Sequence, residues 1–267
     1  MASRSMTVLV VGATGSIGQL VVEEAIKQGH AVRALVRSAS KGRQLARAAE
    51  SVVSDLTRPE TLSAAVDGVD AIVFTHGSDG GGKEASEAVD YGGVRNVLAA
   101  LGSRAARIAL MTSIGVTNRN SSYNRSTEAH DWKRRSERLI RASGLPYTIV
   151  RPGWFDYNGP DEHKLVLLQG DKRHSGTPKD GAIERRQLAE VLVRSLTSDQ
   201  AQRKTFELVS TKGPAQDDFD TLFGNLQPDP PGALDGVQDM DNMPLQDEPK
   251  RVREDLEAIA SRSRLAS

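Results

Sequence analysis

The chain contains no cysteine among its 267 residues. Disulfide bonds, thiolate nucleophiles and cysteine-bound metals are therefore excluded. No apolar run approaches the roughly 18 residues of a membrane-spanning helix, and residues 1–6 lack the apolar core of a signal peptide. We expect a cytoplasmic protein that does not insert into membranes.

An excess of charge of either sign is also missing. The chain carries 35 basic and 35 acidic residues, so it has no global attraction to nucleic acid. With 38% hydrophobic and 26% charged residues it can bury a sizeable core, as ordinary soluble globular proteins do. We predict neither a nucleic-acid partner nor a metal site.

The stretch that organises the chain lies close to its start. The β-prone run Thr7–Val11 leads directly into a turn with glycine at every third position, and a helical pattern then runs from residue 19 to residue 28. Strand, glycine turn and helix in this order are typical of a dinucleotide phosphate site, because backbone N–H groups and the positive end of the helix face the phosphates. The predicted contacts are Gly12, Thr14, Gly15, Ser16, Ile17 and Gly18.

The spacing of these glycines points to a family. Two residues separate Gly12 from Gly15, where the usual dinucleotide-binding fingerprint has one. The pattern resembles the atypical or extended short-chain dehydrogenase/reductases, and within them the NmrA-like, NAD(P)H-binding group. The resemblance runs with gaps from about Thr7 to about Ser210. It implies an α/β fold with a doubly wound parallel sheet, the Rossmann fold.

We expect residues 1–213 to form this domain, with a small substrate-side region in the segments at about 153–183. In chain order, a second strand is predicted at Ala31–Arg37, a helix at Lys41–Glu50 and a short third strand at Ser51–Ser54.

The end of the second strand bears on the choice of cofactor. An acidic residue here would accept from the ribose 2′-hydroxyl of NAD, but the sequence has Arg37 and then Ser38. A guanidinium can instead grip a 2′-phosphate through charge-assisted hydrogen bonds. The competing interpretation is a solvated arginine at a strand end. We predict NADP(H), with NAD(H) less favoured.

Two further strand ends supply candidate cofactor contacts. Relatives place an Asp-Leu pair beside the adenine, which the resemblance carries over to Asp55 and Leu56; the alternative is that Asp55 only begins a turn. Thr75, His76 and Gly77 follow the fourth strand, at the edge where ligands bind in such sheets. His76 is equally compatible with simple exposure.

The catalytic residues of the family are only partly present. The resemblance implies that Ser113, which ends the fifth strand predicted at Arg107–Ser113, holds the substrate oxygen and that Lys133 is the lysine of Tyr-x-x-x-Lys. In that motif the i, i+4 spacing places phenol and ammonium on one helix face. Four residues before Lys133 stands Ala129, so the usual acid is absent.

Three sources of the missing proton stay open. His130 lies three residues before Lys133 on nearly the same face, although it also fits a surface histidine. Tyr123 could fold back from the polar loop 118–127. Alternatively, a flavin or quinone acceptor needs no protein acid, because its reduced form takes protons from solvent.

Aromatic residues make up only 4% of the chain, yet three of them cluster after the sixth strand. In relatives the residues after the proline of Arg151-Pro152-Gly153 cover the nicotinamide and open into the substrate pocket. Pro152, Trp154 and Phe155 are the candidate contacts, with Tyr157 nearby. An aromatic wall suits a planar ligand, and core packing is the competing explanation.

The character of the chain changes after Lys212. Residues 214–249 contain nine carboxylates, no lysine or arginine, and six of the eleven prolines. This composition predicts an extended or disordered arm rather than a packed core. Helical spacing in residues 250–265 predicts a short final helix. We therefore expect residues 214–267 to form an acidic, proline-rich arm that is a candidate subunit contact in a possible homodimer.

Two functions of different kinds follow. The first is an NADPH-dependent oxidoreductase that transfers hydride to a small planar quinone, flavin or carbonyl substrate. The second is a non-catalytic NADP(H) sensor of the NmrA-like type. The missing tyrosine favours the sensor, whereas the retained lysine, serine and aromatic cluster favour the enzyme. A sugar-nucleotide epimerase or dehydratase is a weaker alternative, because it needs the same absent tyrosine.

Overall fold

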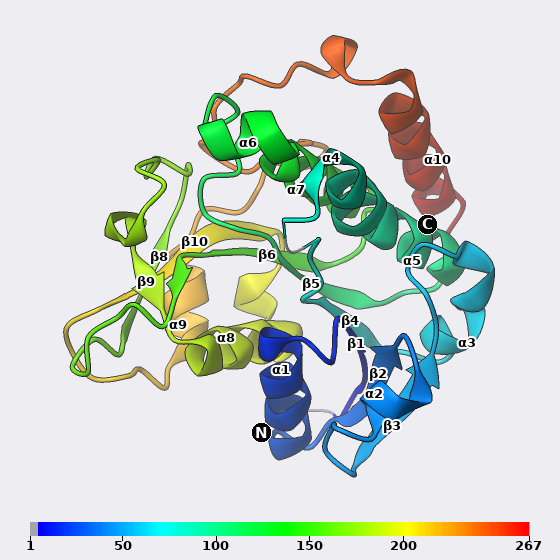
Figure 1. Cartoon of the computed structure of the whole chain (residues 1–267), viewed down its shortest axis with the longest axis horizontal. Helices are drawn as coiled ribbons and strands as arrows, with labels where there is room; N and C mark the ends of the chain where they lie inside the picture. Colours follow the sequence, from blue (N-terminus) through cyan, green and yellow to red (C-terminus); the bar gives the residue numbers. More distant parts are fainter. Residues whose placement is uncertain (1–4, 79, 267) are drawn as a thin grey trace.

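A computed structural model describes residues 5–78 and 80–266 of the chain, with side chains through residue 261 (Figure 1). Residues 1–4, which entered the argument against a signal peptide, lie outside the described residues. Within the described part, no helix is both long and apolar enough to cross a membrane.

The centre of the molecule is an eight-stranded sheet with the order β3-β2-β1-β4-β5-β6-β10-β8. Neighbouring strands are parallel except β8, which runs antiparallel to β10. The order reverses on either side of β1, as in a doubly wound Rossmann sheet. The strands are β1 (Thr7–Val11), β2 (Ala31–Val36), β3 (Ala49–Val53), β4 (Ala71–Phe74), β5 (Arg107–Met111), β6 (Tyr147–Pro152), β8 (Lys164–Leu168) and β10 (Lys204–Thr211), with a separate parallel pair β7 (Trp154–Phe155) and β9 (Ala182–Ile183).

Helices cover both faces of this sheet (Figure 1). The longer ones are α1 (Ser16–Lys27), α5 (Gly92–Leu101), α7 (Ala129–Ala142), α8 (Arg185–Thr197) and α10 (Lys250–Ala266). Short helices are α2 (Ala39–Gly42), α3 (Ser63–Val66), α4 (Gly82–Ala85), α6 (Ser122–Thr127) and α9 (Phe219–Gly224). A π-helix at Ser86–Tyr91 joins α4 to α5.

Strand β1 shows why two faces are covered. Its side chains alternate between the two cores, as the period-2 geometry of a strand requires. Val8 and Val10 pack with α1 and α8 in one core, and Leu9 and Val11 pack with α5, α7 and α10 in the other. The Rossmann fold expected from the glycine-rich turn is confirmed.

The helix expected at residues 41–50 is wrong. Helix α2 stops at Gly42, and β3 already begins at Ala49. The intervening residues 43–48 are exposed apart from Leu45, which is partly buried. With Leu45 as its single large apolar side chain the segment has no stripe to bury, and most helical stability in proteins comes from burying such a stripe.

The composition of residues 214–249 also misled the prediction of an arm without a packed core. Phe219 and Phe223 of α9 are buried in the first core, and Asp229 and Glu248 are buried as well. Buried arginines of α7 bind these two carboxylates, Arg141 that of Asp229 and Arg135 that of Glu248. The chain position at which an arm begins, after residue 213, stays a prediction.

The final helix was expected at 250–265, and α10 spans Lys250–Ala266. Its residues Val252, Leu256 and Ile259 are buried in the second core, where α10 packs on α7 and α5 of the same chain. Tyr91 donates a hydrogen bond to Asp255 of this helix at 2.9 Å. These contacts show docking within one chain; a role of the arm in a homodimer stays a prediction.

Candidate cofactor and substrate site

The glycine-rich turn leaves β1 and enters α1. Gly12 has a φ of +87°, and a Cβ built on it would lie 2.7 Å from the backbone nitrogen of His76. A Cβ on Gly18 would overlap the carbonyl oxygen of Gly12. The first glycine is thus needed for the turn and for its approach to β4, and the third for seating α1 on the turn.

The N-terminus of α1 is free to bind an anion. The N-cap is Gly15, no described side chain caps this end, and the first turn contains no acidic residue. The amide of Gly15 donates to Gly12 at 2.9 Å, which holds the turn together. Unpaired N–H groups and the helix dipole therefore point to the place of the pyrophosphate, and Thr14, Ser16 and Ile17 lie around it.

The end of β2 presents Arg37 as an exposed side chain directly after the strand. Ser38 caps no helix amide, and its hydroxyl lies 2.9 Å from that of Ser40. Asp55 accepts from the backbone N–H of Thr57 at 2.9 Å and from its hydroxyl at 2.8 Å. These two bonds, opposed by burial and aided by Arg58 and Arg37, lower the pKa of Asp55. Asp55 thus makes the turn contact that was one of its two alternatives.

The residues after β4 lie against the glycine-rich turn. The Thr75 hydroxyl donates to the carbonyl oxygen of Val11 at 3.0 Å. His76 Nε2 lies 3.1 Å from the carbonyl oxygen of Val89, while its Nδ1 is buried with no hydrogen-bond partner among the described residues. Burial lowers the pKa of His76 to about 4, so the ring is neutral at neutral pH. His76 is not simply exposed.

Lys133 extends from α7 toward the π-helix. Its Nζ lies 2.6 Å from Oδ1 of the buried Asp90, and the lysine side chain is 18% exposed. Asp90 also accepts from the backbone N–H of Ser78 at 3.2 Å and from its hydroxyl at 2.7 Å. A π-turn is a frequent device for aiming a side chain at a functional site, and here it directs Asp90 to the lysine.

The loop after β5 contains Ser113, whose hydroxyl is buried without a partner in the described part of the chain. Asp171 holds this loop in place. Its carboxylate accepts from Gly115 N at 2.6 Å, from Thr117 N at 2.7 Å and from the Thr117 hydroxyl at 2.8 Å. Because buried polar atoms are nearly always hydrogen-bonded in proteins, the free Ser113 hydroxyl indicates a ligand partner.

His130 stands at the start of α7, with its ring 5.2 Å from the ring of the exposed Tyr123. Burial lowers the pKa of His130, opposed by a hydrogen bond with the backbone of Asn118. Its Nδ1 is buried and finds no partner among the residues described. A neutral ring whose Nε2–H donates to that carbonyl would leave Nδ1 as an acceptor rather than a proton donor.

The position of the missing tyrosine is closed rather than empty. Ala129 is 1% exposed, so neighbouring atoms already fill the space around it. A phenol added there would overpack the start of α7.

The aromatic cluster after β6 is largely on the surface. Pro152 is buried at the end of the strand, but Trp154 is 37% exposed and Tyr157 is 65% exposed, with their rings edge-on at 6.1 Å. Phe155 packs against the first core and lies 5.0 Å from the guanidinium carbon of Arg185. Trp154 and Tyr157 are therefore not core residues, which leaves them free to cover a planar ligand.

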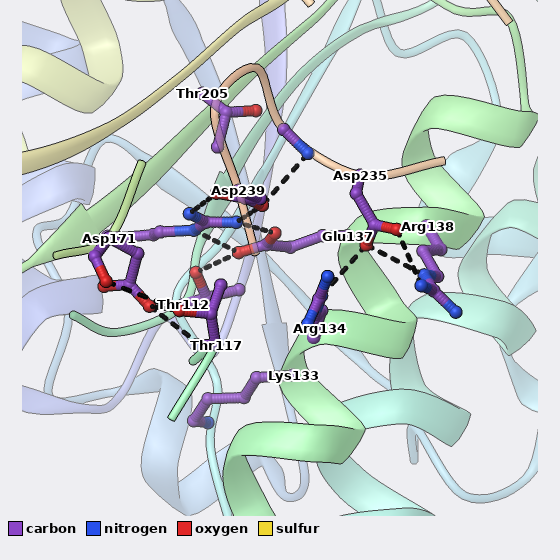
Figure 2. Close-up of polar contacts among 12 residues, drawn as sticks. Thr112, Thr117, Lys133, Arg134, Glu137, Arg138, Asp171, Thr205, Asp235 and Asp239 are labelled. Atoms are coloured by element: carbon purple, nitrogen blue, oxygen red, sulfur yellow. Dashed lines mark hydrogen bonds and ion pairs between the residues drawn. The ribbon is translucent and has the colours of Figure 1, made fainter. Parts of the chain in front are cut away.

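A buried charge network underlies the site, with Glu137 between Thr112 and Asp239 (Figure 2). Glu137 accepts from the Thr112 hydroxyl at 2.8 Å and from Arg151 at 2.7 Å. Arg151 in turn donates to both oxygens of Asp239, at 2.7 and 2.6 Å. Thr112, the residue next to Ser113, is thus connected through Glu137 of α7 and Arg151 of β6 to Asp239. Asp239 belongs to the acidic, proline-rich residues 214–249, here called the acidic segment.

The same segment reaches the loop after β5. Asn242 donates from Nδ2 to the carbonyl oxygen of Thr117 at 3.0 Å and accepts from Arg134 at 2.5 Å. Further buried pairs along α7 join Arg134 and Arg138 to Asp235 (Figure 2). The acidic segment therefore holds both the helix of Lys133 and the loop of Ser113.

Four residues that matter to this geometry were missed from the sequence. Asp90 begins the stretch Asp90–Val97, which resembles a D-x-x-G-x-x-N-V helix of the family, and that resemblance was its only signal. Asp171, Asn242 and Arg185 gave none, because each acts on a segment far away in the sequence.

The fold and this site together define a Rossmann-type dinucleotide-binding protein. The chain belongs to the NAD(P)H-binding family, whose family model matches residues 12–199. It therefore binds NAD(P)H. The resemblance to atypical short-chain dehydrogenase/reductases is confirmed at this level; the NmrA-like subgroup stays a prediction.

Several named proteins are similar to this chain over most of its length. Sanguinarine reductase of Eschscholzia californica is 27% identical, over 84% of this chain and 97% of its own. The uncharacterized sugar epimerase YhfK of Bacillus subtilis is 30% identical, over 78% and 96%. A Bacillus halodurans structure described as an NAD-dependent epimerase/dehydratase shares the fold with a TM-score of 0.66 and 24% identity, over 83% of this chain and all of that one. Together with the family, the similarity to a reductase supports the general class of NAD(P)H-dependent oxidoreductases.

Proposed function

We propose that the protein is an NADPH-dependent oxidoreductase that reduces a small planar acceptor, with quinones and flavins favoured over simple carbonyl compounds. One observation carries this proposal. The buried Ser113 hydroxyl and the Nδ1 atoms of His76 and His130 have no partners among the described residues, and they lie on strand ends and on α7 around Lys133 and the glycine-rich turn. A bound cofactor and acceptor would satisfy them.

The residues divide between cofactor and acceptor. The glycine-rich turn would bind the pyrophosphate, Arg37 the 2′-phosphate and Lys133 the nicotinamide ribose, while Pro152, Trp154 and Phe155 would lie beside the nicotinamide. When bound, NADPH supplies the hydride from its C4 atom. Ser113 would hold an acceptor oxygen by a hydrogen bond.

The source of the proton favours quinones and flavins over simple carbonyl compounds as acceptors. Reduction adds one hydride and one proton to the acceptor. Lys133 is bound by Asp90, and burial lowers the pKa of His130, which disfavours the imidazolium form that could donate a proton. A hydroquinone or reduced flavin takes its proton from water, whereas an alkoxide formed from a simple carbonyl needs an acid in place.

The test is anaerobic NADPH oxidation against a panel of quinones, flavins and simple carbonyls. We expect turnover with quinones or flavins and little with carbonyls, and Ser113→Ala should raise the KM for the acceptor more than that for NADPH. Lys133→Met should greatly reduce this turnover. Its control is Lys212→Met, which changes an exposed lysine outside the site. Fast carbonyl reduction that is unaffected in His130→Ala would contradict the acceptor assignment.

The alternative is a non-catalytic NADP(H) sensor of the NmrA-like type. The buried, alanine-filled tyrosine position favours it, because no phenol acts there. Tight NADPH binding without turnover of any acceptor would support this alternative. The similarity to a protein named as a sugar epimerase keeps epimerase or dehydratase chemistry as a weaker third candidate, which a sugar-nucleotide panel tests.

A further inference from the structure

Arg185 begins α8, yet its side chain reaches the glycine-rich turn. Its Nε donates to the hydroxyl of Ser16 at 3.3 Å, at the first residue of α1. The guanidinium carbon lies 5.0 Å from the centre of the Phe155 ring, within cation–π distance. One arginine therefore touches both the phosphate-binding turn and the segment that follows β6.

The partner of this arginine in the structure is an exposed acid. The Asp156 carboxylate accepts from the backbone N–H of Arg185 at 3.0 Å and forms an ion pair with its guanidinium. Both side chains are partly exposed, and such a pair contributes little free energy. A doubly charged anion at the end of α1 can therefore compete with Asp156 for the guanidinium.

The other cations nearby contact groups away from the glycine-rich turn. Lys133 is bound by Asp90, and Arg186 is directed to Glu23 on α1 at 3.7 Å. Among the described residues, Arg185 is thus the cation that contacts the glycine-rich turn. A pyrophosphate needs positive charge beyond the helix dipole, and arginine binds phosphate with particularly favourable geometry.

We propose that Arg185 is a cofactor-binding residue that leaves Asp156 and binds the pyrophosphate from the side opposite the glycine-rich turn. It links the Trp154–Tyr157 segment to a bound dinucleotide. This inference rests on the dinucleotide site of the proposed function and does not depend on which acceptor is reduced.

The experiment measures dissociation constants by calorimetry for NADPH, NADH and adenosine 2′-monophosphate, without any acceptor. Arg185→Ala should weaken NADPH and NADH by the same factor, about tenfold to a hundredfold for a lost charged hydrogen bond. It should leave adenosine 2′-monophosphate unchanged, because this ligand has no pyrophosphate. Arg37→Ala should show a different pattern. It should weaken NADPH and adenosine 2′-monophosphate, with little effect on NADH.

Arg186→Ala is the matched control, since it removes the adjacent arginine, which is 71% exposed and points to Glu23. Asp156→Asn provides a second, independent variant. Asp156 has a φ of 60°, which asparagine tolerates, and the change removes the competing charge. We expect Asp156→Asn to bind NADPH at least as tightly as the parent.

The outcomes separate the two levels of the argument. A parent that binds neither NADPH nor NADH overturns the dinucleotide site and this inference with it. A parent that binds both, with unchanged affinities in Arg185→Ala, overturns this inference alone. So does a loss in Asp156→Asn equal to that in Arg185→Ala, because the pair would then act only as a structural link.

Discussion

The ammonium group of Lys133 lies 2.6 Å from the carboxylate of Asp90 on the π-helix, while Ala129 stands at the position of the family tyrosine. The lysine is therefore held by an acid rather than by a phenol, and its charge is balanced before any ligand arrives. Asp90 also binds Ser78, so it anchors the loop after β4 to α7. This relationship leads to the first prediction.

Asp90→Asn should destabilise the protein by about 3–5 kcal/mol, the usual cost of removing one partner of a buried ion pair. NADPH affinity should fall as well, because Lys133 loses its fixed position. Urea unfolding measures the first effect and calorimetry the second. Glu84→Gln, at an exposed position next to the π-helix, is the control and should stay within about 0.5 kcal/mol of the parent. Unchanged stability in Asp90→Asn would show that the pair is unimportant.

Arg37→Ala should weaken NADPH binding by about 1.5–3 kcal/mol, the range for hydrogen bonds to charged groups, with little effect on NADH. The physical reason is that only NADPH carries the 2′-phosphate that the guanidinium would bind. Titration of both dinucleotides checks this. Equal losses for the two cofactors, or tighter NADH binding in the parent, would refute the preference for NADPH.

His76 gives a prediction about pH. Its pKa is about 4 in the folded protein and about 6.5 when exposed, so the unfolded chain takes up a proton first as the pH falls. Above pH 6.5 the buried neutral ring contributes on the order of 3 kcal/mol to the free energy of unfolding. This contribution is lost as the pH falls from 6.5 to 4.

His76→Gln should remove this part of the acid destabilisation, as measured by urea unfolding from pH 7.5 to 4. His163→Gln changes a more exposed histidine, with a 41% exposed side chain, and is the control. If the parent and His76→Gln lose stability in parallel over this range, the assignment of His76 as a buried, neutral residue is wrong.

Asp239→Asn should lower the free energy of unfolding by about 1.5–3 kcal/mol. The buried Arg151 keeps its ion pair with Glu137 but loses its charged hydrogen bonds to Asp239. The parent should resist limited proteolysis between residues 229 and 248, and the variant should be cut there. Asp241→Asn, an exposed neighbour, is the control. Rapid cleavage of the parent in this segment would contradict its packing against α7.

The sequence was sufficient to predict the parts of the fold that depend on local pattern. The order of strand, turn and helix around Gly12 identifies the dinucleotide site, because those residues are adjacent and each has a distinct physical role. It could not show that Asp229 and Glu248 are buried, since their partners are arginines of α7 that lie 88 and 113 residues away in the sequence. Composition counts charges but not the pairs they form.

The candidate site divides in the same way. Ser113 and Lys133 were found because they occupy family positions, and His130 because it lies three residues before Lys133; the roles of all three remain predictions. Asp171 and Arg185 were not found, because each contacts a segment distant in sequence, with Asp171 binding Gly115 and Arg185 binding Ser16. Only the three-dimensional arrangement brings these pairs together.

The most direct test of the central claim is the rate of NADPH oxidation with a quinone acceptor, compared between NADPH and NADPH carrying deuterium at the transferred C4 position. The assay is run anaerobically in a single turnover, so that product release does not hide the chemical step. Hydride transfer at this site predicts enzyme-dependent oxidation that is slower with the deuterated cofactor and greatly reduced in Lys133→Met. Tight NADPH binding without oxidation, across quinones and flavins, would contradict an oxidoreductase and favour the sensor.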